Sequence, residues 1–173
     1  MPIFDSLPAL SDRDLPSVTA AQEFLAHTFT NPSLARCAMT SPGWTNENQH
    51  LGWQSWKTLE WQGDAVLYLV LTDTLIRGDA KKSIESRASS RDWTQSNYHL
   101  ASCAGQALWE HLFLGRGERT NNAEWGNHKF IADSLEALIG AVWFDCRTSG
   151  TDPLQTCERL LLNTLDVMGQ NPD

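Results

Sequence analysis

The chain has 173 residues, of which 41% are hydrophobic and 20% charged, so it can bury one good-sized core. Its 11 glycines and 7 prolines match ordinary globular usage, which excludes collagen-like and low-complexity proteins. The formal net charge of −8 argues against a general nucleic-acid binder with a basic surface. Metal ions bound to carboxylates can reverse a local field, so the acidity does not exclude a polyanionic substrate.

Targeting signals are not visible in this sequence. The longest apolar run, Ala65–Leu71, is far shorter than the roughly 20 residues of a membrane span. The first residues lack a basic start, so neither a secretory nor a transit peptide is predicted, and we expect an intracellular protein. Four cysteines without metal-type spacing predict reduced thiols in the core. We expect a single domain over residues 17–169, between an extension at 1–16 and a tail at 170–173.

Apolar residues recur at helical spacing along most of the chain, which predicts an all-α domain. A capping box at Thr19 predicts a first helix that extends to Phe29. Asn31 followed by Pro32 predicts the start of a second, short helix. The next segment, residues 41–54, is predicted to be a loop.

The middle of the chain contains a long apolar helix and a basic segment. Residues 56–76 are apolar on nearly every helical side, which predicts a central buried helix that Gly78 ends. Residues 77–91 form the densest basic segment, and their composition favours a solvated connection. Helical spacing resumes over residues 93–113.

The last third of the chain again predicts helices. Residues 114–127 are rich in glycine and asparagine and predict a loop. A second buried helix is predicted over residues 128–145. Asp152 before Pro153 is typical of a helix start, so a final helix is expected there.

Acidic residues within the two most apolar helices are the unusual feature of this pattern. Glu60 and Asp64 are four residues apart, and Asp133 and Glu136 are three apart, so each pair projects from one helix face. Ionised carboxylates that meet in a core are costly unless a cation compensates them. Oxygen ligands alone favour Mg²⁺ or Mn²⁺. The spacing fits equally well with acids on the exposed stripes of amphipathic helices.

Other sites have less support in the sequence. A di-iron bundle requires two Glu-x-x-His pairs, whereas only Glu47 and His50 have that spacing, in the predicted loop. None of the five histidines lies in a recognisable nucleophile motif.

Gly63 and Gly140 interrupt good helices beside the acids, which predicts a close approach of two backbones there.

Two segments resemble the ribonuclease III family of double-stranded RNA endonucleases: KTLEWQGDAVL is similar to its signature helix, and HKFIADSLEALIGAVWFD to its second acidic helix. SNYHLASCA and LARCAMTSPGW resemble the segments between and before them. The resemblance covers roughly residues 20–168. It implies the all-α ribonuclease III-like endonuclease fold, with residues 17–169 as the catalytic domain.

The resemblance also implies roles for individual residues. Lys129 matches a lysine near the scissile phosphate, and Trp61 matches a side chain that inserts into the partner subunit of a homodimer. Departures from the family pattern are Lys57 in place of an acid, Gln62 in place of an apolar residue and Ser41 in place of a histidine. The catalytic, metal-binding acids implied by the resemblance are Glu60, Asp64, Asp133 and Glu136.

The function that follows is hydrolysis of phosphodiesters in double-stranded RNA by water activated at a metal pair, with Mg²⁺ as cofactor and Mn²⁺ as a substitute. The resemblance implies a homodimer that leaves short 3′ overhangs. The alternative is a catalytically silent member that binds RNA or serves as a ribosomal structural component. Candidate RNA-binding residues are Lys81, Lys82, Arg87 and Arg116.

The family's larger members carry a separate double-stranded RNA-binding domain. Only five residues follow Met168 here, so we expect that module to be absent. RNA binding would then be weaker and more sensitive to salt, unless an RNA-binding partner protein supplies the missing surface.

Overall fold

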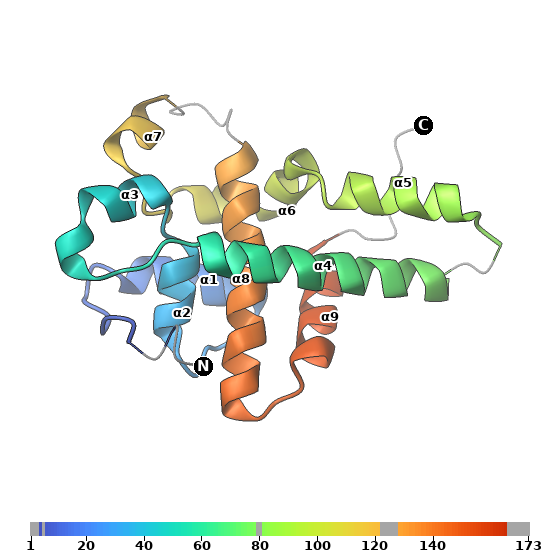
Figure 1. Ribbon diagram of the computed structural model, residues 1–173, viewed down its shortest axis with the longest axis horizontal. Helices are drawn as coiled ribbons and strands as arrows, with labels where there is room; N and C mark the ends of the chain where they lie inside the picture. The colour runs from blue at the N-terminus through green and yellow to red at the C-terminus, as the bar shows by residue number, and fades with distance from the viewer. Residues whose placement is uncertain (1–3, 5, 79–80, 122–127, 166–173) are drawn as a thin grey trace.

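The computed structural model describes residues 4, 6–78, 81–121 and 128–165. Within these ranges the regular structure is helical, and the β-type pairing is limited to an isolated bridge between Thr40 and Phe113. The all-α prediction is confirmed. The helices, drawn in Figure 1, are α1 (Leu15–Leu25), α2 (Pro32–Ala38), α3 (Pro42–Glu47), η2 (Gln49–Leu51), α4 (Lys57–Gly78), α5 (Ile84–Thr94), α6 (Asn97–Trp109), α7 (Arg116–Asn121), α8 (His128–Ser149) and α9 (Pro153–Thr164).

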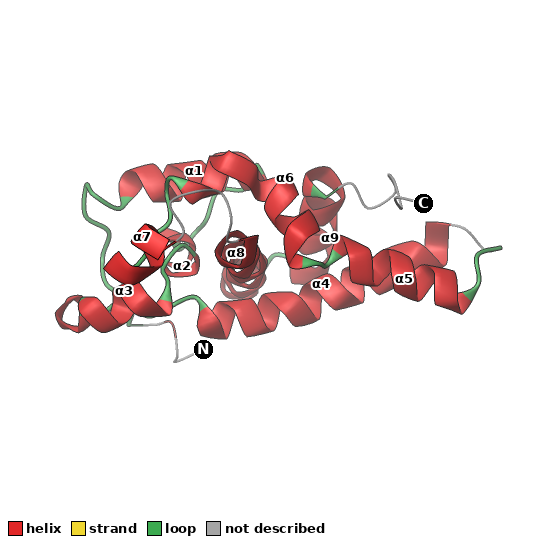
Figure 2. Ribbon diagram, turned by 90° about the horizontal axis from the view of Figure 1, so that it is seen from above, coloured by secondary structure: helices red, strands yellow, loops and turns green. Residues whose placement is uncertain are grey.

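Helix α8 is the centre of the molecule. Figure 2 looks nearly along its axis and shows the other helices arranged around it, and α8 packs against α2, α4, α6 and α9. Nearly every residue from Ile131 to Cys146 is buried, which confirms the predicted second buried helix. Helix α4 runs across α8 in Figure 1, so the two longest helices meet at one crossing.

The backbones of α4 and α8 touch at this crossing. A Cβ atom on Gly63 would lie 1.7 Å from the carbonyl oxygen of Glu136, and one on Gly140 would lie 2.1 Å from that of Leu59. No side chain larger than hydrogen fits at either position without moving a helix. The predicted close approach is confirmed.

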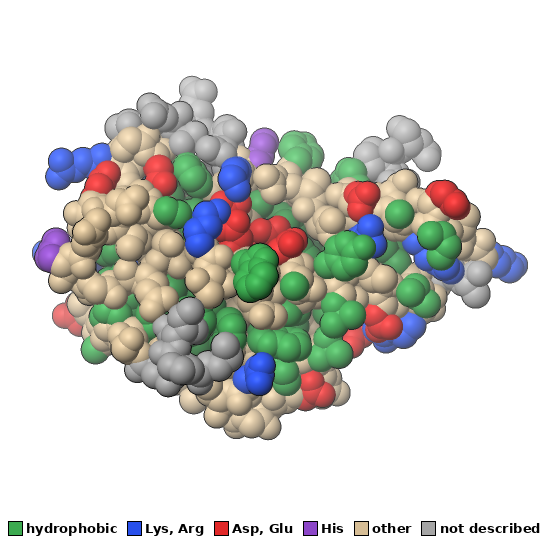
Figure 3. Space-filling model, viewed as in Figure 1, with side chains coloured by type: hydrophobic (Ala, Val, Ile, Leu, Met, Phe, Trp, Pro, Cys, Tyr) green, Lys and Arg blue, Asp and Glu red, His purple; other side chains and the backbone are tan. Residues whose placement is uncertain are grey.

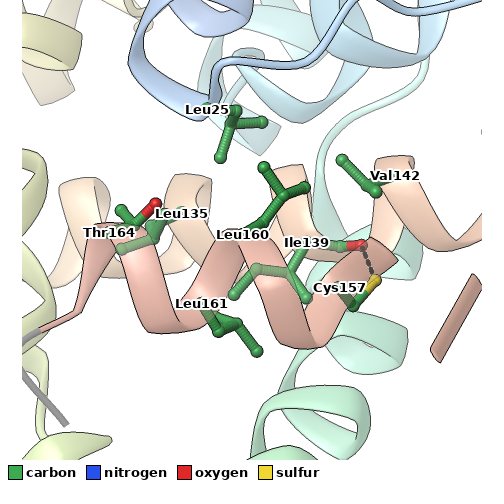
Figure 4. Close-up of a pocket in the computed structure, with 8 residues that line it drawn as sticks. All are labelled: Leu25, Leu135, Ile139, Val142, Cys157, Leu160, Leu161 and Thr164. Atoms are coloured by element: carbon green, nitrogen blue, oxygen red, sulfur yellow. Dashed lines mark hydrogen bonds between the residues drawn. The ribbon is translucent and has the colours of Figure 1, made fainter. Parts of the chain in front are cut away.

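The rest of the core is apolar. Helix α9 covers the C-terminal half of α8 and, with Leu25 of α1, encloses a small cavity (Figure 4). The Cys157 thiol donates weakly to the Ile139 carbonyl there, at 3.9 Å. The cavity lining is Leu25, Leu135, Ile139, Val142, Cys157, Leu160, Leu161 and Thr164.

Buried polar groups anchor the N-terminal third to this core. The Asp145 carboxylate accepts hydrogen bonds from the backbone N–H groups of Thr30 (2.9 Å) and Asn31 (2.8 Å), just before α2. The buried Arg36 guanidinium donates to Asp14 at 2.5 Å and stacks on Phe113. Asp145 therefore joins the start of α2 to α8, and Arg36 joins α2 to the start of α1.

The predicted starts of two helices are confirmed, and that of the first is wrong. The side chain of Asn31 accepts from the N–H of Ser33, and that of Asp152 accepts from Leu154 and Gln155. Helix α1, however, begins at Leu15 and ends at Leu25, instead of starting at Thr19 and extending to Phe29. The Gln22 side chain that the capping box requires instead accepts from the N–H of Phe29 at 3.0 Å.

Three segments predicted to be irregular contain short helices. The segment 41–54 contains α3 and η2, 77–91 contains most of α5, and 114–127 contains α7, with residues 122–127 outside the described part. Serine side chains explain two of these starts, because Ser41 accepts from the N–H of Trp44 and Ser83 from that of Ser86. The helix predicted over 93–113 is shorter, since Ser96 caps a new helix, α6.

The long helix α4 is confirmed in extent, but it is not buried all round as predicted. One face packs on α8, whereas Trp61, Tyr68, Leu69 and Ile76 are exposed. Helical spacing places these four on one outer stripe. Arg91 of α5 stacks on the Tyr68 ring, 4.1 Å from its centroid, and the stripe is otherwise open to solvent among the described residues. The apolar residues of α4 therefore lie on two faces of the helix, one in the core and one at the surface.

The cysteines are free, and Cys37, Cys146 and Cys157 are buried while Cys103 is partly exposed, as predicted for reduced thiols. Burial raises the pKa of the Cys37 and Cys157 thiols to about 12.

None of the described helices is both long and apolar enough to cross a membrane. Phe4 packs against Phe144 with ring centroids 5.0 Å apart. The domain limits at residues 16 and 169 stay predictions, and residues 170–173 lie outside the described part.

The α4–α8 crossing can be tested with Gly63→Ala. We expect a loss of at least about 2 kcal/mol in the free energy of unfolding, because the added methyl group meets a backbone carbonyl that cannot yield. Thermal and urea unfolding measure this loss. The control is Gly117→Ala, where a Cβ would meet nothing within 4 Å and should leave stability unchanged or raised. Equal stability of the two variants would contradict the contact.

Candidate metal centre

The crossing of α4 and α8 brings three predicted acids together. Glu60 of α4 and Asp133 and Glu136 of α8 each offer a carboxylate oxygen, and these oxygens lie within 4.8 Å of one another. The Asp133 side chain is 5% exposed and that of Glu60 is 18% exposed, so the cluster lies at the edge of the core. Figure 3 shows acidic side chains beside basic ones near the middle of this face.

Asp64, the fourth predicted acid, lies one turn after Glu60 on α4. Its side chain is exposed and lies outside the group of three. Its negative charge nevertheless acts on the cluster, because it is one of the causes that raise the pKa of Glu136. Of the four acids, only Asp64 therefore lies on an exposed helix face, which was the alternative to a shared metal site.

Glu136 is the acid in the most unfavourable environment. Burial, followed by the negative charges of Asp64, Asp133 and Glu60, raises its pKa to about 8. Within the described residues its carboxylate forms neither a hydrogen bond nor an ion pair, and the charge of nearby Lys129 only partly offsets the rise in its pKa. A partly buried carboxylate with no partner has a lone pair to offer a cation.

Two lysines contact the other two acids. Lys129 donates to both oxygens of Asp133 at 2.7 and 2.9 Å. Lys57 donates to both oxygens of Glu60, at 2.9 and 2.7 Å, and to Asp133 at 3.3 Å. Although burial lowers the pKa of Lys57, its hydrogen bonds and the charges of Glu60 and Asp133 raise it above the usual value.

In the sequence alone, Lys57 stands out only as a departure from the family pattern. Its three-residue spacing from Glu60 indicates a contact on one helix face. Its contact with Asp133 could not be found from the sequence, because it depends on how α8 crosses α4.

The donor set fits a hard divalent cation. All the candidate ligands are carboxylate oxygens, they come from two rigid helices, and one of them has no protein partner. Such ligands favour Mg²⁺ or Mn²⁺ over softer metals. A cation would also offset the repulsion among the acids.

The remaining predicted residues do not form one patch. Trp61 is 79% exposed, next to Glu60 on α4. Lys81 and Lys82 are exposed just before α5, and Arg87 is half-buried within it. Arg116 is exposed at the start of α7, and Figure 1 shows α5 and α7 toward opposite ends of the molecule.

Two departures from the family pattern have structural positions here. Ser41 is fully buried, caps α3 and hydrogen-bonds the carboxylate of Glu118, which also accepts from the N–H of Gly115 at 2.8 Å. Gln62 is half-buried on α4. Ser41 therefore holds α3 and α7 together and takes no part in the acidic cluster.

Comparison with known proteins assigns this arrangement to a family. The model of the Ribonuclease-III-like family matches residues 31–162, which is more than half of the chain and includes both acidic helices. The chain belongs to the ribonuclease III-like family. The fold and family implied by the sequence resemblance are confirmed.

Two relatives show the extent of the similarity. Ribonuclease 3 of Carboxydothermus hydrogenoformans is 34% identical over 138 residues, which cover 77% of this ribonuclease III-like chain and 57% of that protein. Ribonuclease 3 of Borreliella afzelii is 33% identical over 125 residues, which cover 71% and 50%. The chain thus spans about half the length of these relatives.

Solved structures share the fold. A 2.2 Å crystal structure of the nuclease domain of ribonuclease III from Campylobacter jejuni matches with a TM-score of 0.72 and 20% identity, over 90% of this chain and 97% of that one. A second structure of this domain, which describes flexibility in a region involved in dimer formation, matches with a TM-score of 0.69 and 22% identity, over 85% and 97%.

The raised pKa of Glu136 makes the stability of the metal-free protein depend on pH. The unfolded chain releases this proton near its ordinary pKa of 4.5, whereas the folded protein keeps it up to about 8. The contribution of Glu136 to the free energy of unfolding is therefore largest below pH 4.5. It decreases as the pH rises from 4.5 to about 8. Glu136→Gln cannot lose a proton there, so it should melt several degrees higher than the wild type near pH 8 and little higher near pH 5.

Melting curves in chelator across this pH range measure the effect. Glu158→Gln, which removes an acid paired with Arg77 outside the cluster, is the control for general charge effects. A difference between Glu136→Gln and the wild type that stays constant with pH would contradict the raised pKa.

Proposed function

We propose that this chain is the catalytic domain of a divalent-metal-dependent endoribonuclease that hydrolyses phosphodiesters in double-stranded RNA. The observation that carries the proposal is the convergence of Glu60, Asp133 and Glu136 at the crossing of two helices. The resemblance of the sequence to the family implies a metal-binding role for the same acids, which supports the proposal. The names of the relatives support the same activity.

In this proposal Glu136, Asp133 and Glu60 hold Mg²⁺, with Asp64 adding negative charge from the exposed side. The ion supplies charge compensation at the phosphate and activation of water. Lys129 orients the Asp133 carboxylate through two hydrogen bonds, and its side chain remains 56% exposed, within reach of a phosphate. The side chains of this site are fixed by helices, which keeps the ligands in place before RNA arrives.

RNA contacts are proposed on either side of the cluster. Lys81, Lys82 and Arg87 lie at α5 and Arg116 at α7, so a duplex that crosses the acidic cluster passes basic groups on both sides. Such contacts bind the phosphates without reading sequence, and an A-form duplex is recognised by shape and 2′-hydroxyl groups.

We also propose a homodimer formed through the outer stripe of α4. Trp61, Tyr68, Leu69 and Ile76 form an exposed apolar face, which a second copy of the chain would bury. The description of a region involved in dimer formation in the Campylobacter jejuni domain supports self-association. Two sites related by the dimer axis would cut opposite strands and leave short 3′ overhangs.

Cleavage of a labelled RNA duplex tests the activity. The wild type should cut it with Mg²⁺ and not with chelator, and Glu136→Gln should lose cleavage by orders of magnitude while keeping its fold, because it loses the charge that holds a cation. Glu158→Gln, the same substitution outside the cluster, should cut normally. If the wild type fails to cut the duplex with any divalent metal ion, the result would instead indicate the catalytically silent alternative.

The dimer is tested with Trp61→Ala. Removing an aromatic anchor from an interface costs more than about 2 kcal/mol, so the dissociation constant should rise by about thirtyfold or more. Analytical ultracentrifugation measures this change. Leu154→Ala, which removes an exposed apolar side chain from α9, is the control. A wild type that is monomeric at micromolar concentration would exclude the dimer, and an unchanged dissociation constant of Trp61→Ala would remove that side chain from the interface.

A further inference from the structure

Lys57 holds an ammonium group among the carboxylates that the proposed function assigns to metal binding. It is the first residue of α4, and its Nζ contacts both oxygens of Glu60 and one oxygen of Asp133. These acids come from different helices and are two of the three that converge. The ammonium group therefore bridges the two helices at the place where a cation is most favourable.

A simple surface ion pair does not account for this position. The pairing of Lys57 with Glu60 alone would be an ordinary contact along one helix, worth little in stability. The additional contact is with Asp133, whose side chain is only 5% exposed and which already pairs with Lys129. Two ammonium groups thus share one nearly buried carboxylate.

The charge of the cluster affects how many metal ions it favours. When a bound cation keeps all four acids ionised, their charges and those of the Lys57 and Lys129 ammonium groups sum to −2 before the cation is counted. One divalent ion neutralises that charge, whereas a second would leave an excess of positive charge beside two lysines. An acid at position 57 in place of lysine would instead give −4, which matches two divalent ions.

The acids that the lysines leave without a partner also fit a single divalent ion. Glu136 has no hydrogen-bond or ion-pair partner among the described residues, and Asp64 likewise has none. Glu60 and Asp133 are the acids that the lysines contact. One ion can use Glu136 together with the oxygens of its neighbours that remain available, while Lys57 keeps its own place.

We propose that the Lys57 ammonium group takes the place of one cation of a metal pair, so that each chain binds a single divalent ion. The proposal rests on the proposed function, because it concerns the same carboxylates. It makes Lys57 a positioning residue that fixes Glu60 and Asp133 and supplies a permanent positive charge. The site then differs from a two-ion site in its metal stoichiometry as well as in its charge.

Mn²⁺ binding without RNA tests this proposal directly. Titration of metal-free protein, followed by the loss of the electron paramagnetic resonance signal of free Mn²⁺, counts the ions bound per chain. We expect one ion for the wild type and two for Lys57→Glu. Glutamate suits the first turn of a helix, so this variant should fold, which circular dichroism checks.

Two further variants separate charge from ligand effects. Lys57→Gln removes the ammonium group without adding a carboxylate, so it should bind the first Mn²⁺ severalfold tighter than the wild type. Arg159→Glu makes the same charge change as Lys57→Glu on an exposed part of α9 and should still bind one ion.

The outcomes distinguish this inference from the function on which it rests. Two ions bound by the wild type, or one by Lys57→Glu, would overturn the role of Lys57 while cleavage by the wild type still supported the proposed function. Unchanged affinity in Lys57→Gln would also overturn it. A wild type that neither binds Mn²⁺ nor cuts RNA would overturn the proposed function itself.

Discussion

The contact between the backbones of α4 and α8 is the constraint on which the rest of the structure depends. Gly63 and Gly140 let the two longest helices touch, and this contact fixes both the centre of the fold and the position of the acids. Glu60 lies one turn before Gly63, and Glu136 lies one turn before Gly140. A wider separation of the helices would draw these carboxylates apart and leave no common site for a cation.

The acidic cluster lowers the stability of the fold at the proposed metal site. Asp145, on the same helix, is also buried, but two backbone N–H groups satisfy it. Despite burial, its pKa is lowered by the nearby His27 imidazole, at 3.5 Å, and by the hydrogen bonds that it accepts from Asn31 and Thr30. Glu136 has no such partner, and burial with three neighbouring acids raises its pKa. The first carboxylate holds the fold together, whereas the second destabilises the metal-free protein. Such an arrangement is typical of a functional site.

Helix α4 links the two proposed activities of the chain, metal binding and self-association. Glu60 and Trp61 are adjacent in sequence, yet one faces α8 and the other faces solvent on the apolar stripe. A partner that buries Trp61 would therefore hold the first turns of α4, which carry Lys57 and Glu60. In the proposed dimer, association and the geometry of the site would be coupled through a single rigid helix.

The sequence by itself determined the helical class, the two long helices and the residues that meet at their crossing. The pairs Glu60/Asp64 and Asp133/Glu136, with a glycine close to each pair, carry that information because helical periodicity and glycine packing are local properties. The sequence could not distinguish the core face of α4 from its exposed stripe, since both are apolar. Only the tertiary structure decided that Asp64 stands apart and that Lys57 reaches Asp133, because contacts between helices depend on how they pack, which no local pattern encodes.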